Sequence, residues 1–149
     1  MKYITLTVLL FFASFNIMAQ GKTFPTELKY RNSINSYVGL IELNFNYERN
    51  IIQSPKSYTN IRAGYGYWTN LQLEGACVEA VGVHVLGRKN SHPEFNLGVK
   101  YIIDKADKDD AFVPLVYAGY RFEEPEGRIV FRFGLTFPSI FNLGLGWKF

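Results

Sequence analysis

The sequence predicts an all-β protein: a single antiparallel up-and-down β-barrel of eight strands that crosses a membrane. Aromatic residues make up 17% of the chain, yet charged residues still make up 19%. Apolar and polar residues alternate with a period of two in one segment after another, which is the strand signature. After residue 20 no apolar run is long enough for a spanning helix. A chain this apolar must bury its surface in a core or show it to lipid through a closed barrel.

The N-terminal segment has the layout of a secretory signal. Lys2 is basic, Ile4 to Phe15 is an apolar run, and Ala19 is the small residue before the expected cut. The run is too short for a membrane anchor, which needs about 20 apolar residues. We therefore expect residues 1–19 to be a cleaved signal peptide and residues 20–149 to form one outer-membrane barrel domain.

Charge and cysteine content narrow the function. Without Lys2, 15 basic residues face 13 acidic ones, so the mature chain has a net charge of +2. This near-neutral balance gives no support for a nucleic-acid partner. Cys77 is the single cysteine, which excludes an internal disulfide and paired metal-binding cysteines. We expect no cofactor, no metal and no catalytic residues.

The first predicted strands run from Glu27 to Ile34, from 41 to 48 and from 60 to 67. The first is the weakest, and the turn-like residues Asn32 to Ser36, which overlap its end, lead to the next strand. It is included because bacterial barrels have an even number of strands. In the other two, the apolar face holds Ile41, Leu43, Phe45, Tyr47, Ile61, Ala63, Tyr65 and Tyr67.

The segment from Gly75 to Gly87 alternates least clearly. We place Val81, Val83 and Val85 on the apolar face, and Ala80, Gly82 and His84 on the opposite face. This choice leaves Glu79 on the apolar side near a strand end. A lone histidine in the interior favours a hydrogen-bonding role, because a metal site needs three or four ligands.

The last four strands span 94–103, 112–122, 128–137 and 141–149. Their apolar faces hold Phe95, Leu97, Val99, Tyr101, Ile103, Val116, Ala118, Tyr120, Phe122, Ile129, Phe131, Phe133, Leu135 and Phe137. The final strand alternates most strictly, with Phe141, Leu143, Leu145, Trp147 and Phe149 at its odd positions. Trp68, Tyr67, Tyr101, Tyr120 and Trp147 are expected near the membrane interfaces, where amphipathic rings gather.

The face opposite the aromatic one decides between a membrane barrel and a soluble one. It carries Glu42, Glu48, Arg62, Glu94, Lys100, Arg121, Arg128, Arg132 and Lys148. Most strand glycines lie on the same face. Glycine weakens a strand that is open to water, whereas a narrow, crowded barrel interior needs small residues beside large charged ones. We therefore predict a charged, glycine-rich interior and an apolar, lipid-facing exterior, as in transmembrane barrels.

These features resemble the small eight-stranded outer-membrane barrels of the OmpA-transmembrane-domain or OmpX type. Asn46-Tyr47-Glu48-Arg49, Ile61-Arg62-Ala63-Gly64 and Gly119-Tyr120-Arg121-Phe122 look like a group of short, uncharacterised outer-membrane barrel proteins. A short turn at Glu123 to Gly127 fits the same pattern. The resemblance implies a Gram-negative outer-membrane location and contact with membrane lipid. It also implies that the alternating apolar residues ending at Phe149 are read by the barrel-assembly machinery.

The interior charges are the main candidate site. In an eight-stranded barrel, side chains fill the lumen, and buried charges must be paired. Three acids and six bases in the set above would then form a salt-bridged plug. The alternative is a narrow basic conduit for small anions.

Two further segments carry residues typical of functional sites. Ser91-His92 with Glu94 suggests a hydrolase, but neighbouring residues beside Pro93 fit the required geometry poorly and are typical of a turn. Asp104 to Asp110 is the most charged loop and lacks EF-hand spacing, so we expect a solvated exterior loop.

The sequence thus favours a monomeric, non-enzymatic outer-membrane barrel of the cell envelope, with a structural or surface-interaction role and no open pore. A lipid-modifying barrel enzyme and a soluble periplasmic ligand-binding barrel are the alternatives.

Overall fold

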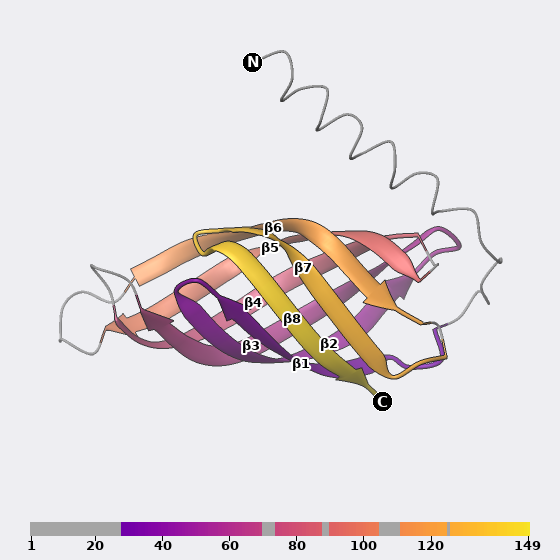
Figure 1. Ribbon diagram of the computed structural model, residues 1–149, viewed down its shortest axis with the longest axis horizontal. Coiled ribbons are helices and arrows are strands. Elements are labelled where there is room, and N and C mark those ends of the chain that lie inside the picture. Colours follow the sequence, from indigo (N-terminus) through magenta and orange to yellow (C-terminus); the bar gives the residue numbers. More distant parts are fainter. Residues whose placement is uncertain (1–27, 70–73, 88–89, 105–110, 125) are drawn as a thin grey trace, which may run out of the picture.

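The computed structural model describes residues 28–69, 74–87, 90–104, 111–124 and 126–149, and they form a closed barrel of eight antiparallel strands. Each strand pairs with its neighbours in the chain, and β1 pairs with β8 to close the sheet (Figure 1). The strands are β1 (Asn32–Gly39), β2 (Glu42–Gln53), β3 (Ser57–Thr69), β4 (Glu74–Leu86), β5 (Ser91–Asp104), β6 (Ala111–Glu123), β7 (Ile129–Phe137) and β8 (Ile140–Lys148). Within these residues, no helix is long and apolar enough to cross a membrane. The predicted fold class and strand number are confirmed, whereas the signal peptide lies outside the described residues.

Closure of the barrel brings the start of β1 beside the end of the chain. The backbone N–H of Asn32 donates to the carbonyl of Phe149 at 3.2 Å, and the N–H of Phe149 donates back at 2.9 Å. We call this end of the barrel the terminus end. The β2–β3, β4–β5 and β6–β7 connections lie there, and the other connections lie at the far end, because consecutive strands are antiparallel.

The first strand lies later in the chain than predicted. Residues 28–31 are not a strand, Glu27 lies outside the described residues, and β1 starts at Asn32, where the sequence suggested a turn. The polar residues fit the strand because Ser33 and Asn35 point into the narrow interior, where small side chains are needed. Leu28 instead packs against an apolar cluster inside the barrel, and its N–H donates to Gln53.

The predicted orientation of β4 is wrong. Val81, Val83 and Val85 lie inside the barrel and are at most 4% exposed, whereas Gly82 and His84 face outward. Ala80 faces outward with them. The buried Glu79 lies on the same face as the valines and contacts Arg62 and Lys100. Glu79 therefore determines the orientation of the strand, because valine fits either face whereas the carboxylate finds its cationic partners only inside the barrel.

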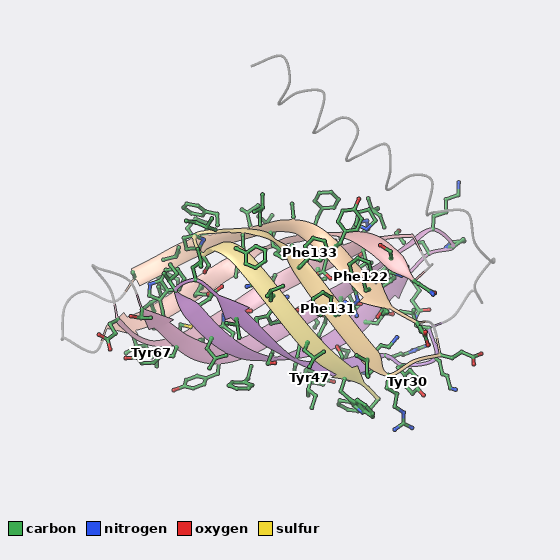
Figure 2. The ribbon with its side chains drawn as sticks, in the orientation of Figure 1. Tyr30, Tyr47, Tyr67, Phe122, Phe131 and Phe133 are labelled. Atoms are coloured by element: carbon green, nitrogen blue, oxygen red, sulfur yellow. The ribbon has the colours of Figure 1, made fainter. Side chains whose placement is uncertain are left out.

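The outer surface of the barrel is apolar over most of its circumference. Leu97, Leu135 and Phe112 are 70%, 66% and 76% exposed, and aromatic side chains such as Tyr47 and Tyr67 also lie on the outside of the barrel (Figure 2). Phe141, Leu143, Leu145 and Trp147 on β8 and Phe149 just after it are all exposed on the outside, as the pattern predicts. Among the residues expected at interfaces, Tyr67 and Trp147 are exposed on the outer surface, but Trp68 is buried inside the barrel.

Glycines let large side chains cross the interior. Gly119 on β6 and Gly134 on β7 are paired on neighbouring strands, and the Tyr117 side chain lies over both. A Cβ at Gly134 would lie 2.6 Å from the Ala118 carbonyl and 2.8 Å from the Tyr117 ring. Since backbone atoms are among the neighbours, no small adjustment makes room for a methyl group.

Candidate functional site: a charged network inside the barrel

Among the described residues, ten Glu, Lys and Arg side chains are buried inside the barrel, five acidic and five basic. They are Glu42, Glu48, Glu79, Glu94, Glu123, Arg62, Lys100, Arg121, Arg132 and Lys148. Eight of the nine residues predicted for the lumen are therefore inside, and the ninth, Arg128, is not. Glu79 and Glu123 were missed, so the interior is balanced in charge and not basic, within the part of the chain that is described.

Glu48 is the centre of the network. Its Oε1 accepts hydrogen bonds from Arg121 Nη1 at 2.6 Å and from Asn60 Nδ2 at 2.5 Å. Arg132 places one Nη atom 2.9 Å from Oε1 and the other 2.8 Å from Oε2. Alternation along β2, β6 and β7 points these three charged side chains inward from different sides of the barrel. One carboxylate thus compensates two guanidinium groups that are almost fully buried.

The network continues from Glu48 toward the terminus end. Glu94 Oε2 lies 3.3 Å from Arg132 Nε and 3.7 Å from Arg121 Nη1. Arg121 Nε lies 3.1 Å from Glu123 Oε2, which in turn lies 3.4 Å from Lys148 Nζ. Each acid of this half therefore contacts two cations, which is the arrangement expected where an unpaired buried charge would be very costly.

Tyr58 and Glu124 complete this half of the network. The hydroxyl of the buried Tyr58 donates to Glu123. The Lys148 ammonium donates to the Glu124 carbonyl at 2.8 Å, which gives it a second oxygen partner near the barrel mouth.

A second group of charges lies toward the far end. Lys100 is fully buried, contacts Glu42 and lies 3.4 Å from Glu79 Oε2. Arg62 Nε lies 3.4 Å from Glu79 Oε1. Asn142 Nδ2 donates to Glu42 Oε1 at 3.2 Å. Both acids are thus shared between partners on several strands, so the group links opposite walls of the barrel.

Aromatic rings support the cations of both groups. The Arg62 guanidinium lies 4.6 Å from the ring centroid of Tyr37 and donates to its hydroxyl at 2.8 Å. The Arg132 guanidinium lies 5.5 Å from the same ring. Lys100 Nζ lies 5.1 Å from the Trp68 ring. Contact with ring faces stabilises desolvated cations, which explains why Trp68 is inside and not in the outer aromatic belt.

Apolar clusters fill the space around the charges. One contains Tyr58, Val81, Val83, Val85, Leu115 and Tyr117. The other contains Trp68, Cys77 and Ile102. Cys77 is buried in this cluster, and its thiol donates to Asn44 Oδ1 at 3.3 Å. A pocket at the terminus end has a volume of about 20 Å³, enough for about one water molecule.

Two predicted lumen residues lie elsewhere. Arg128 is exposed in the β6–β7 turn, just before β7 begins, where strand alternation does not yet apply. His84 faces outward, and its Nδ1 lies 3.0 Å from the hydroxyl of Thr59. Neither contributes to the interior network.

The hydrolase hypothesis does not fit the geometry of its residues. Ser91, His92 and Pro93 form the start of β5 and not a turn. As adjacent strand residues, Ser91 and His92 point to opposite faces of the sheet, and only His92 is fully inside the barrel. Nucleophile and base would have to meet within hydrogen-bond reach. Among the described side chains, no group of three or more His, Cys, Asp and Glu residues could hold a metal ion. The charged loop at 105–110 lies outside the described residues.

Comparisons with known proteins agree with this architecture. The sequence matches no protein-family model and no curated protein. The crystal structure of the N-terminal β-barrel domain of Pseudomonas aeruginosa OprF is similar, with a TM-score of 0.53 and 11% sequence identity. The match covers 80% of this chain and 96% of that one. At this identity the likeness is one of fold: the chain has the eight-stranded barrel fold of an OmpA-type outer-membrane domain.

Proposed function

We propose that the chain is an integral outer-membrane barrel protein of a Gram-negative envelope, with a structural or surface-interaction role and a closed lumen. The observation that carries this proposal is the inside-out distribution of side chains. Arg132, Lys100 and Glu94 are at most 1% exposed inside the barrel, while large apolar side chains cover its outside. A water-soluble barrel has the opposite arrangement, and an alternating apolar exterior is typical of transmembrane barrels.

The balance of interior charge supports a plug over an anion conduit. A conduit for small anions needs cations that remain available to the passing ion. Here each of the five bases lies within 4.0 Å of at least one acid. Apolar clusters occupy both halves of the remaining space, as expected for the narrow lumen of eight strands.

The last strand bears on both the assembly of the barrel in the membrane and its oligomeric state. The four outward residues Phe141, Leu143, Leu145 and Trp147 on β8, together with Phe149 just after it, form the pattern that we propose the barrel-assembly machinery reads. Closure of β1 against β8 pairs the strand edges within one chain, so a monomer is sufficient for a stable barrel.

Heat-modifiable migration tests the membrane assignment most directly. The purified full-length protein, refolded in detergent, is expected to migrate differently on a denaturing gel before and after boiling, because a folded outer-membrane barrel resists detergent. Extraction of native membranes without detergent is the companion measurement. Identical migration together with release into the soluble fraction would contradict the proposal.

Conductance in planar lipid bilayers tests the closed lumen. The folded protein is expected to insert without producing stable openings. Reproducible anion-selective openings would contradict the plug and support the conduit.

A further inference from the structure

Barrel closure gathers four side chains from three distant parts of the sequence at the outer edge of the terminus end. β8 pairs with β1 on one side and β7 on the other. Lys29 and Tyr30 precede β1, Arg128 precedes β7, and Trp147 lies near the end of β8. The N–H of Lys148 donates to the Arg128 carbonyl at 2.7 Å, which ties the turn to β8. We call Lys29, Tyr30, Arg128 and Trp147 the rim cation cluster.

Aromatic rings hold both cations of the cluster. The Arg128 guanidinium lies 5.7 Å from the ring centroids of both Tyr30 and Trp147, and its Nε donates to the Tyr30 hydroxyl at 3.4 Å. Lys29 Nζ lies 5.6 Å from the Tyr30 ring. Contacts with ring faces position the cations while leaving their charges uncompensated.

No acid neutralises the cluster within the described part of the chain. Lys29 and Arg128 have no ion pair there, although Glu124 and Glu126 lie in the same turn as Arg128. The interior bases, in contrast, all face carboxylates. The hydrogen bond from Arg128 lowers the pKa of the exposed Tyr30 hydroxyl, and the charges of Lys29 and Arg128 act in the same direction. The cluster thus presents a local excess of positive charge to an outside group.

The surface beside the cluster is suited to a lipid chain. Trp147 is 46% exposed on the apolar outer face and pairs with Ile129 in the β7–β8 register. Phe131 lies on β7 two residues after Ile129, further from the terminus end, and is 43% exposed. Its ring centroid lies 6.3 Å from that of Phe122 (Figure 2). An anion bound at the cluster would therefore sit at the membrane edge, next to an aromatic surface that faces the hydrocarbon region.

We propose that the rim cation cluster binds the phosphate of an anionic phospholipid in the leaflet at the terminus end, with an acyl chain lying along Trp147 and Phe131. Two uncompensated cations favour a headgroup with net negative charge over a zwitterionic one. The adjoining apolar surface favours a lipid over a soluble anion. The inference rests on the proposed membrane insertion.

Quenching of tryptophan fluorescence by brominated lipids tests the site. The folded full-length protein is reconstituted into vesicles that mix phosphatidylcholine and phosphatidylglycerol, with bromine on either one or the other lipid. Since Trp68 is buried inside the barrel, lipid quenching reports on Trp147. We expect phosphatidylglycerol to be preferred at Trp147 by about fivefold, the effect of about one cation at a membrane surface.

Matched variants show whether Arg128 causes the preference. Arg128→Gln is expected to lower the preference for phosphatidylglycerol markedly, with Lys29 supplying what remains, while Arg128→Lys keeps most of the preference. Arg49→Gln removes another exposed arginine, on β2 beside Asn32, and is expected to leave it unchanged. Heat-modifiable migration confirms that each variant folds.

Three results would overturn the site. They are equal quenching by the two lipids in the unmodified protein, a preference unchanged by Arg128→Gln, and a preference abolished by excess inorganic phosphate, which would point to a soluble anion. Quenching by neither brominated lipid would instead overturn membrane insertion itself, so the two failures are distinguishable.

Discussion

Replacing Glu48 by glutamine tests whether ion pairing holds the barrel interior together. Glu48 is 1% exposed and contacts two guanidinium groups, those of Arg121 and Arg132. Glutamine has nearly the same shape, so the change removes the negative charge and little packing. It leaves two positive groups in a low-dielectric interior with one acid fewer.

The size of the effect follows from the partners that remain. Breaking a buried ion pair by removing one partner destabilises a protein by about 3–5 kcal/mol. Here Arg132 keeps Glu94 at 3.3 Å, and Arg121 keeps Glu123 at 3.1 Å. The amide oxygen can still accept one hydrogen bond. We therefore expect the free energy of unfolding to fall by about 3 kcal/mol, the lower end of that range.

Urea unfolding of the protein in phospholipid vesicles, followed by tryptophan fluorescence, measures this change. The matched control is Glu126→Gln, an exposed acid in the β6–β7 turn, which should alter stability by at most about 0.5 kcal/mol. Combining Glu48→Gln with Arg132→Met should recover part of the loss, because both charges are removed. A loss below about 1 kcal/mol for Glu48→Gln would refute the reasoning that pairing offsets the burial of these charges.

Three further predictions concern other parts of the molecule. Gly134→Ala should abolish heat-modifiable migration because its Cβ would lie 2.6 Å from a backbone carbonyl, whereas Gly82→Ala, whose nearest neighbour is at 3.6 Å, should fold normally. In folded protein in vesicles, a cysteine introduced by Gly82→Cys should react with a membrane-permeant maleimide. A cysteine introduced by Val83→Cys should react only after unfolding. The reverse pattern of reactivity would contradict the orientation of β4. The pKa of Tyr30 lies below its ordinary value because Arg128 stabilises the phenolate, so Arg128→Gln should raise it; NMR titration of labelled tyrosine measures this, and an unchanged pKa would contradict the contact.

The fold and most strand faces could be predicted because charge and hydrophobicity agree along most strands. On β2, Glu42 and Glu48 mark the interior face while Phe45 marks the exterior one, so a single alternation satisfies both. The same agreement holds on β8, where Lys148 points inward and Trp147 outward. Where the two signals agree, the period of two is sufficient to orient the strand.

Sequence prediction of strand position and side-chain direction fails where one of these signals is weak or where the strand has not yet begun. The Asn- and Ser-rich start of β1 was interpreted as a turn, although Ser33 and Asn35 are suited to a crowded lumen. The prediction of Arg128 in the lumen extends strand alternation to the residue before β7, where it does not yet apply. The location of Trp68 was predicted from its residue type, although its neighbour Tyr67 already faces outward and adjacent residues must differ.

The orientation of β4 shows which signal should take precedence in such a barrel. In the proposed membrane barrel, apolar side chains are stable on both faces, because lipid would lie outside and apolar clusters lie inside. The three valines of β4 therefore carry little information about its orientation. A shift of one residue would expose Glu79 to lipid and remove it from Lys100 and Arg62. On the lipid face, Lys or Arg costs about 2–4 kcal/mol at the membrane midplane, and an acid costs somewhat less. On the strands β2 to β8, which carry the interior charges, ion pairs therefore specify which face points inward as well as filling the lumen.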